Sequence, residues 1–151
     1  MNLPLIKMID SPPVWLAGFA AVAYGQGRLF PIESDAVSHV IGGALVALGL
    51  GLMALAFVEF RRHKTTVIPH QTASALITRG IFARTRNPIY LGDALVLAGL
   101  CLRWDAVISL ILVPVFVLLI TQRFILAEEM RLESGFGAEF RQYCQQTRRW
   151  V

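Results

Sequence analysis

Two short groups of polar residues in this chain could do chemistry. The segment Arg86-Asn87-Pro88-Ile89-Tyr90-Leu91-Gly92 stands where a basic, polar stretch turns into an apolar helix, and further along another apolar helix runs out into Glu128-Glu129. Neither a soluble core nor a plain membrane anchor needs such groups. Polar side chains gathered at one end of apolar helices therefore predict a reaction site at a membrane surface.

Two residues of the first group share one helical face with the acid that follows it. Tyr90 is one helical turn from both Arg86 and Asp93, so the three form a stripe. Ionisable groups inside a membrane helix are costly and usually face the protein interior or a wet cavity. Asp93 either pairs with Arg86 or reaches out to water, or it contacts a substrate headgroup or accepts a proton. The sequence leaves both readings open.

The acidic pair and a glycine pair carry little weight alone. Glu128 and Glu129 would ordinarily be solvated surface, or would pair with Arg131 or Arg123. Gly49-Leu50-Gly51 is more typical of helix packing than of a nucleotide site.

Composition supports a membrane protein. The 151 residues are 56% hydrophobic and 16% charged, whereas soluble domains average about a quarter charged. Four apolar stretches carry the excess, and about 20 such residues span a bilayer. Because charge is nearly absent inside them, a soluble bundle is disfavoured. We predict one domain over 1–151, an all-α integral membrane bundle of about four transmembrane helices, with spans near 12–30, 38–58, 88–102 and 106–122.

The distribution of basic residues predicts the topology. Segment 61–87 has six basic residues and no acid, the tail from 123 has five arginines, and the connection 31–37 carries only two acids. By the positive-inside rule, both long polar segments and both termini face the cytoplasm, and we expect the inner membrane of a bacterium. The net charge of +4 then reflects topology and attraction to anionic lipids. No nucleic-acid partner is expected, because the basic residues flank spans.

Local patterns predict how the helices pack and begin. Gly43, Ala47 and Gly51 recur every four residues, which predicts a smooth face for close helix contact. Asn87 precedes Pro88 and is expected to be the N-cap of the third helix, with its amide accepting from free backbone N–H groups. Arg103-Trp104-Asp105 should turn the last two spans into a hairpin. Segment 61–87 should fold over the cytoplasmic end.

The C-terminal part is expected to form a helical cap. The fourth helix should run on through Phe124–Leu132 and stop near Gly135. A last helix has its aromatic residues on one face, which predicts that it lies flat among lipid headgroups, with Trp150 as an interfacial anchor. Those residues are Phe136, Phe140 and Tyr143. Cys101 and Cys144 should lie on opposite sides of the membrane and cannot pair, so no disulfide is expected. No metal site is expected either, because no Cys/His cluster has ligand spacing.

Taken together, these motifs resemble a known superfamily. From about Lys64 onward the chain is similar to the integral-membrane methyltransferases of the isoprenylcysteine carboxyl methyltransferase and phospholipid methyltransferase superfamily. The resembling pieces match in order and spacing over more than half the chain. They are Thr65–Pro69, Leu76–Phe82, Arg86–Gly92, Glu128-Glu129 and Phe136–Tyr143. Carboxyl methyltransferases usually have His where this chain has Asn87, a form that looks more like the phosphatidylethanolamine N-methyltransferases. Gly49-Leu50-Gly51 stands where the phospholipid enzymes have a Gly-x-Gly element.

The resemblance implies S-adenosylmethionine as methyl donor, bound at the cytoplasmic side by about 64–151. The candidate catalytic residues are Tyr90 and Arg86, which the resemblance maps to the site, and Asp93, which could accept a proton. The Tyr90 ring suits a sulfonium cation, and carboxylates suit the amino group or ribose of the donor. The cofactor-binding residues it implies are Arg86, Asn87, Tyr90, Gly92, Glu128 and Glu129, together with His70 and Ile81.

The methyl acceptor stays open at this point. The superfamily favours carboxyl O-methylation of a prenylated cysteine, whereas Asn87 and the small size allow phospholipid N-methylation. Only an amine acceptor would need a base, for which Asp93 or a glutamate is a candidate. The expected partners are a lipidic or amphipathic acceptor and the membrane lipids; the oligomeric state is not predicted. A non-catalytic membrane protein or a transporter is the alternative of another class, and the position of Asp93 near one end of its span argues against transport.

Overall fold

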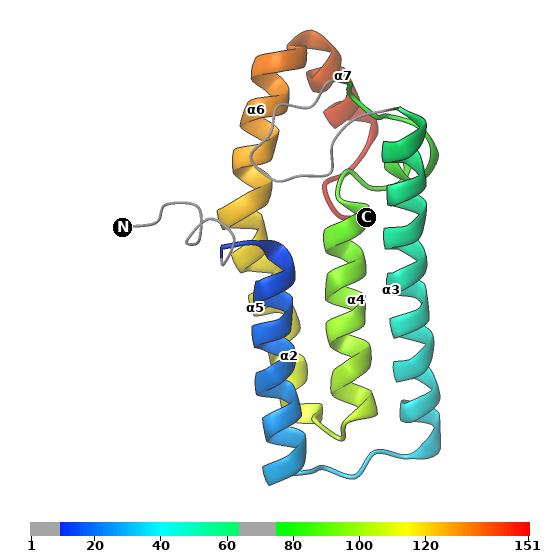
Figure 1. Cartoon of the computed structure of the whole chain (residues 1–151), viewed down its shortest axis with the longest axis vertical. Coiled ribbons are helices and arrows are strands. Elements are labelled where there is room, and N and C mark those ends of the chain that lie inside the picture. Colours follow the sequence, from blue (N-terminus) through cyan, green and yellow to red (C-terminus); the bar gives the residue numbers. More distant parts are fainter. Residues whose placement is uncertain (1–9, 64–74) are drawn as a thin grey trace.

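The computed structural model describes residues 10–63 and 75–151, and all regular structure within them is helical. Four long rods stand side by side, and a short helix and the C-terminal segment fold across one end (Figure 1). This confirms the all-α prediction for the described residues. The elements are α2 (Pro12–Leu29), α3 (Ala36–Arg62), η1 (Gly80–Ala83), α4 (Pro88–Arg103), η2 (Val107–Ile111), α5 (Leu112–Ile120), η3 (Thr121–Ile125), α6 (Leu126–Phe136) and α7 (Ala138–Gln146).

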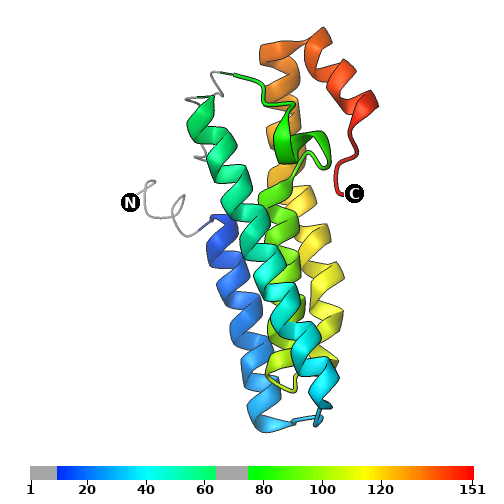
Figure 2. The same cartoon turned by 90° about the vertical axis from the view of Figure 1, so that its right-hand side faces the viewer.

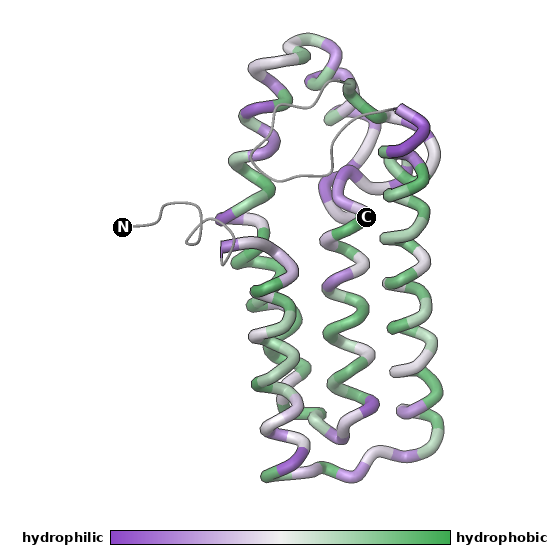
Figure 3. The backbone as a smooth tube through the Cα atoms, in the orientation of Figure 1, coloured by the Kyte–Doolittle hydropathy of each residue, from purple (hydrophilic) through white to green (hydrophobic). Residues whose placement is uncertain are grey.

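Two of these helices are long and apolar enough to cross a membrane. They are Ala36–Arg62, with 27 residues, and the continuous helix Val107–Phe136, with 30. Their middle parts carry mostly apolar residues and the polar residues gather toward the ends (Figure 3). This confirms the second and fourth stretches as candidate spans. The helices α2 and α4, with 18 and 16 residues, lie beside them, and their crossing of the membrane stays a prediction.

Helices α3 and α4 pack through glycines that oppose one another in antiparallel register. A Cβ at Gly49 would lie 2.5 Å from the carbonyl oxygen of Gly92, and one at Gly99 would lie 2.5 Å from that of Gly42. Small residues let backbones approach this closely. The predicted contact face was therefore wrong: a Cβ at Gly43 or Gly51 would meet nothing within 4 Å. The glycines in contact are seven residues apart on each helix, Gly42 and Gly49 on α3 and Gly92 and Gly99 on α4. Residues seven apart lie on the same face of a helix, so both glycines of each helix can face the antiparallel partner.

The turn between α4 and η2 confirms the predicted hairpin and closes the far end of the bundle. Asp105 has φ 54°, a left-handed conformation that Asp tolerates better than most residues. Its carboxylate accepts from Ser34 N at 2.9 Å, and its carbonyl accepts from Ile32 N at 3.0 Å. The α2–α3 connection is thereby tied to this turn. Nearby, Gln26 Oε1 accepts from both the backbone N (3.1 Å) and the hydroxyl (3.0 Å) of Ser109.

The last long helix changes its winding twice on the way to the site. It begins as the 3₁₀ turn η2 and continues without a break as α5, which contains Pro114. Residues Thr121–Ile125 form a π-helical turn, η3, before α6. Such a turn rotates the helix beyond it, and π-helical turns are frequent at functional sites. The predicted continuation is confirmed, with the end at Phe136 and a left-handed Gly137 (φ 51°).

Helix α7 packs on protein with its aromatic face, which corrects the prediction of a helix lying flat among headgroups. Phe140 and Tyr143 are both buried, and Tyr143 donates to the carbonyl of Phe82 in η1 at 2.6 Å. Burial raises the pKa of the Tyr143 phenol, so it stays a donor. Figure 2 shows η1, α7 and the C-terminal segment together beside the start of α4. Segment 61–87 thus ends in a turn held against the bundle, as predicted for its described part.

Candidate active site

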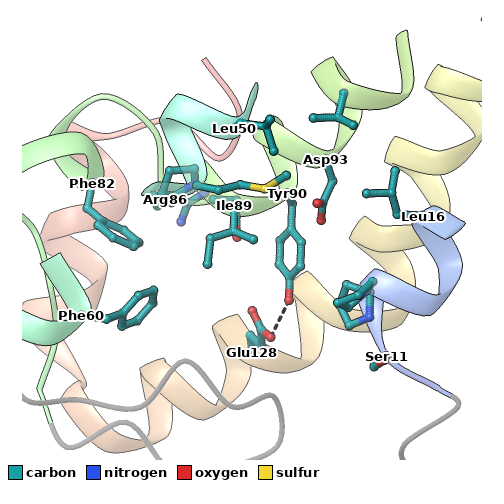
Figure 4. A pocket seen from close by; sticks show the side chains of 16 residues that line it. Ser11, Leu16, Leu50, Phe60, Phe82, Arg86, Ile89, Tyr90, Asp93 and Glu128 are labelled. Atoms are coloured by element: carbon teal, nitrogen blue, oxygen red, sulfur yellow. Dashed lines mark hydrogen bonds between the residues drawn. The ribbon is translucent and has the colours of Figure 1, made fainter. Parts of the chain in front are cut away.

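A cavity of about 550 Å³ opens where α2, α3, α4 and α6 approach one another at the end that carries α7 (Figure 4). Its wall is mostly apolar and includes a few polar and charged side chains. Its wall consists of Ser11, Pro12, Pro13, Leu16, Leu50, Met53, Phe60, Phe82, Arg86, Asn87, Pro88, Ile89, Tyr90, Asp93, Val96 and Glu128. The two predicted polar groups therefore meet at one cavity.

Tyr90 stands in the middle of this cavity. Its hydroxyl donates to Glu128 Oε1 at 2.8 Å, which joins α4 to α6 across 38 residues of sequence. In Figure 4 the ring lies between two groups of side chains, with Phe60, Phe82, Arg86 and Ile89 on one side and Ser11, Leu16 and Asp93 on the other. The hydrogen bond holds the ring at this position between the two groups of side chains.

Asp93 is a buried carboxylate in the cavity wall, with 6% of its surface exposed. Within the residues that the structure describes, its side chain makes no hydrogen bond or ion pair. The predicted alternative of a pair with Arg86 is therefore wrong, because Arg86 is engaged elsewhere. A buried polar group without a protein partner is uncommon and points to a ligand or water as its partner.

Arg86 lies just before α4, and its guanidinium crosses to α6 and α7. Its Nη2 is 3.3 Å from Glu129 Oε1, and its Nη1 contacts Cys144 Sγ. The Nε atom is buried without a partner among the described residues. Because the helix starts at Pro88, the predicted helical stripe of Arg86, Tyr90 and Asp93 is wrong in detail. The three side chains nevertheless line the same cavity.

The two adjacent glutamates point in different directions. Glu128 faces the cavity and accepts from Tyr90. Glu129 instead accepts from Arg149, at 2.9 Å from Nε and 2.6 Å from Nη2, and pairs with Arg86. These hydrogen bonds raise the pKa of Arg149. Successive residues of a helix are about 100° apart, which is why the two carboxylates point in different directions. Both carboxylates are half-buried rather than solvated, and Glu128 has the expected Arg131 as a charged neighbour.

Asn87 occupies the predicted N-cap position of α4 but does not cap it with its side chain. Its Nδ2 donates to the carbonyl of Arg149 at 3.0 Å, while its backbone N donates to Thr85 Oγ1 at 3.2 Å. Pro88 at the helix start has no N–H to satisfy. The amide is therefore free to hold the C-terminal segment.

Two further predicted residues lie away from the cavity wall. Gly92 is in the contact with Gly49 and Met53. Ile81 packs in a small apolar cluster with Ala56, Ile77 and Phe82. His70 falls outside the described residues. The Gly49 of the glycine pair serves helix packing, and Gly51 is on the outer face of α3.

Sequence reasoning missed the contribution of both chain ends. Ser11, Pro12 and Pro13 form cavity wall, and the turn is held because Asp10 accepts from Arg123 at 2.6 and 3.0 Å. Trp15 also donates to Asp10 at 3.1 Å. The acid and the tryptophan beside the two prolines were the available signal. Arg149 had been counted only for topology, since nothing in the sequence shows which arginines turn inward.

Comparison with known proteins identifies the family. A stretch of 53 residues is 45% identical to an uncharacterized protein from Haemophilus influenzae, covering 35% of this chain and 75% of that protein. No solved structure matches. The sequence profile of the phospholipid methyltransferase family matches residues 37–139, more than half of the chain and a range that includes α3, α4, Tyr90, Asp93 and both glutamates. The chain belongs to the phospholipid methyltransferase family, whose name implies a methyltransferase acting on lipid-type substrates.

Proposed function

We propose that this protein transfers a methyl group from S-adenosylmethionine to the amine headgroup of a membrane phospholipid. The observation that carries the proposal is Asp93, a buried carboxylate that lines the cavity with no protein partner among the described residues. A cationic or protonated headgroup would satisfy it. A carboxylate acceptor would be repelled by it, because like charges in a partly dry cavity interact strongly.

The residues on one side of Tyr90 fit the methyl donor. The buried Nε of Arg86 is a donor without a partner in the described chain, which suits a carboxylate oxygen. Phe60 and Phe82 offer aromatic surface nearby. The Tyr90 ring can stabilise a sulfonium by about 0.5–2 kcal/mol. When bound, S-adenosylmethionine supplies a methyl group on a positively charged sulfur that leaves with the bonding electron pair.

The residues on the other side of Tyr90 fit a lipid acceptor. Asp93 lies beside apolar wall from Leu16, Leu50, Met53 and Val96. Leu50 is 55% exposed on the outer surface of a candidate span, so the cavity reaches a surface that lipid would cover. We infer that an acyl chain enters sideways between α2 and α3, with the headgroup resting at Asp93. The donor would enter from the polar end.

Within this arrangement the chain positions the reactants and takes a proton. Asp93 would first accept a proton from the ammonium headgroup, which frees the nitrogen lone pair, and the chain would hold that nitrogen in line with the methyl group that bound S-adenosylmethionine would supply. Fixing the two reactants near contact can supply about 7–11 kcal/mol of the barrier reduction, and a positioned base typically adds about 10²–10⁴-fold. Glu128 holds the Tyr90 ring between the two parts of the cavity.

Carboxyl O-methylation of a prenylated cysteine is the second candidate, and one observation favours it. The unpartnered Arg86 Nε could bind the acceptor carboxylate instead of the donor. That reaction needs no base, so Asp93 would then have no part in the reaction or would repel the acceptor carboxylate.

Substitution of Asp93 separates the two candidates. Purified protein in nanodiscs would be given labelled S-adenosylmethionine and either phosphatidylethanolamine or a prenylcysteine analogue. We expect methylated phospholipid, and Asp93→Asn should lower its kcat by about 100-fold while the thermal midpoint holds or rises. Methylation of the prenylcysteine alone, undiminished by Asp93→Asn, would contradict the proposal.

We further propose that the site faces the cytoplasm, because exposed arginines surround it. Arg61, Arg62, Arg79 and Arg84 are all exposed around the α3–α4 end that holds the cavity. A single cysteine placed at the exposed Glu133 of α6, in a chain without its natural cysteines, should react with an impermeant maleimide only after cells are opened. Labelling in intact cells would reverse the orientation.

A further inference from the structure

The C-terminal strap, defined here as Thr147–Val151, crosses the start of α4 and holds it by its backbone. The carbonyl of Arg148 accepts from Arg86 N at 3.0 Å. The carbonyl of Arg149 accepts from Asn87 Nδ2 at 3.0 Å and from Thr85 Oγ1 at 3.3 Å. Three consecutive residues at the polar rim of the cavity are therefore ordered by two peptide units of the strap.

The side chain of Arg149 completes this attachment by binding Glu129 on α6. Both of its contacts, at 2.6 and 2.9 Å, are shorter than the 3.3 Å between Glu129 and Arg86. Bidentate pairs of this kind are strong and directional. Glu129 therefore lies closer to Arg149 than to Arg86. The three charged groups form a row in which Glu129 stands between Arg149 and Arg86. Arg149 does not line the cavity.

We propose that Arg149 is a positioning residue for the donor half of the site, an inference that rests on the proposed methyl transfer. It places Arg86 through Glu129, and Asn87 through its own carbonyl. Without its guanidinium, Glu129 shifts toward Arg86 and draws that side chain away from the cavity wall. The acceptor half, around Asp93 and Leu16, has no contact with the strap among the described hydrogen bonds and ion pairs.

The strap also explains why the predicted residues Asn87 and Glu129 have partners already. A group that is saturated by the protein's own chain is poorly suited to bind a ligand directly, since its partners would have to be displaced. Contacts from the strap and Glu129 hold the site residues in place before a ligand arrives, so binding has less side-chain entropy to remove. Arg149 therefore acts before the donor arrives, and its effect should appear in donor binding as well as in turnover.

The test is a calorimetric titration of detergent-purified full-length protein with S-adenosylhomocysteine. Arg149→Ala should raise the Kd about tenfold, and Arg149→Lys should recover part of the loss, because an ammonium pairs with Glu129 but cannot bind it bidentately. Arg141→Ala is the matched control: it also removes one positive charge, from an exposed pair with Glu133 at 3.3 Å on the same helical cap, and should leave the Kd unchanged.

Each result decides a different question. If the unchanged protein binds no S-adenosylhomocysteine, the proposed function fails before the strap is tested. If the unchanged protein binds and Arg149→Ala binds equally well, the positioning role is wrong. In steady-state assays Arg149→Ala should raise the KM for S-adenosylmethionine and leave that for the acceptor within about twofold. Equal increases in both KM values, with a lowered thermal midpoint, would make Arg149 a general structural contact and overturn the inference.

Discussion

The two ends of the helical bundle satisfy their polar groups differently. At the far end, Asp105 bonds with Ser34 and His39, and Gln26 bonds with Ser109. At the site end, Arg86 Nε is buried without a partner among the described residues. The Asp93 side chain lines the cavity and takes part in no hydrogen bond or ion pair of the described chain. Since buried polar groups are nearly always paired, the difference marks where a ligand is needed. Under the proposed function, it also separates polar groups that maintain the fold from those that would bind the reactants.

This contrast has an energetic consequence. Removing a polar group from the far end leaves its partner unsatisfied and should lower the free energy of unfolding, without touching turnover. Removing Asp93 relieves an unpaired buried group, so activity should fall while stability is kept or improved, a trade-off common at active sites. Mutations at the two ends should therefore separate stability from rate.

The largest effect is expected at Tyr90. Tyr90→Leu removes the ring that stands between the two parts of the cavity and the hydroxyl that holds Glu128. We expect kcat/KM to fall by about 100-fold or more, or roughly 2.7 kcal/mol of transition-state stabilisation. Labelled-methyl incorporation into phospholipid measures it, alongside the thermal midpoint.

Tyr90→Phe sharpens this test, because it keeps the aromatic face and removes only the hydrogen bond to Glu128. If the ring face is what matters, Phe should retain most of the activity that Leu loses. If Phe and Leu are equally inactive, the hydroxyl and its bond to Glu128 are the essential feature. A loss of folded protein in both would make Tyr90 a packing residue.

A smaller effect is expected from the glycine contact that joins the two ends. Gly49→Ala places a Cβ 2.5 Å from the Gly92 carbonyl oxygen and 2.9 Å from Val96, a cavity-wall residue. It should lower the free energy of unfolding by about 1–3 kcal/mol and also reduce turnover. Gly42→Ala, next to Gly99 near the far end, should destabilise similarly with little effect on turnover per folded molecule.

Gly51→Ala is the control for both variants, because a Cβ there meets nothing within 4 Å. Its stability should be unchanged or slightly higher, since Ala favours helix over Gly. If Gly51→Ala destabilised as much as Gly49→Ala, the contact face of α3 would have been assigned wrongly.

The fold was largely predictable because its signals are local. Long apolar stretches, the basic segments around them and the Arg103-Trp104-Asp105 turn predicted the helices and the hairpin. The meeting of Tyr90 with Glu128 was expected only through the family resemblance, because periodicity within one helix says nothing about a partner 38 residues away. Both sources pointed to the same end of the bundle.

The features that could not be predicted depend on rotation about helix axes and on the chain ends. Small residues at Gly43, Ala47 and Gly51 formed a better local pattern than Gly42 and Gly49, yet the latter face α4. The π-helical turn at Thr121–Ile125 rotates α6 and so helps decide which glutamate faces the cavity. Local sequence patterns do not resolve a rotation of this size, nor which of several arginines binds Glu129.

The smallest effect is expected at the far end of the bundle, where the polar groups are paired within the protein. Substitutions there should change stability and leave turnover unchanged. Asp105→Asn keeps a side-chain acceptor for Ser34 N and tolerates the left-handed backbone of φ 54°, so only the partly exposed pair with His39 at 3.3 Å is lost. Such pairs contribute about 0–1 kcal/mol. Asp105→Ala loses the acceptor as well and should cost about 1–3 kcal/mol, because Ala is strained there. Turnover per folded molecule should be unchanged in both variants, since Asp105 does not line the cavity. A fall in kcat with Asp105→Asn would mean that the two ends are coupled through α4.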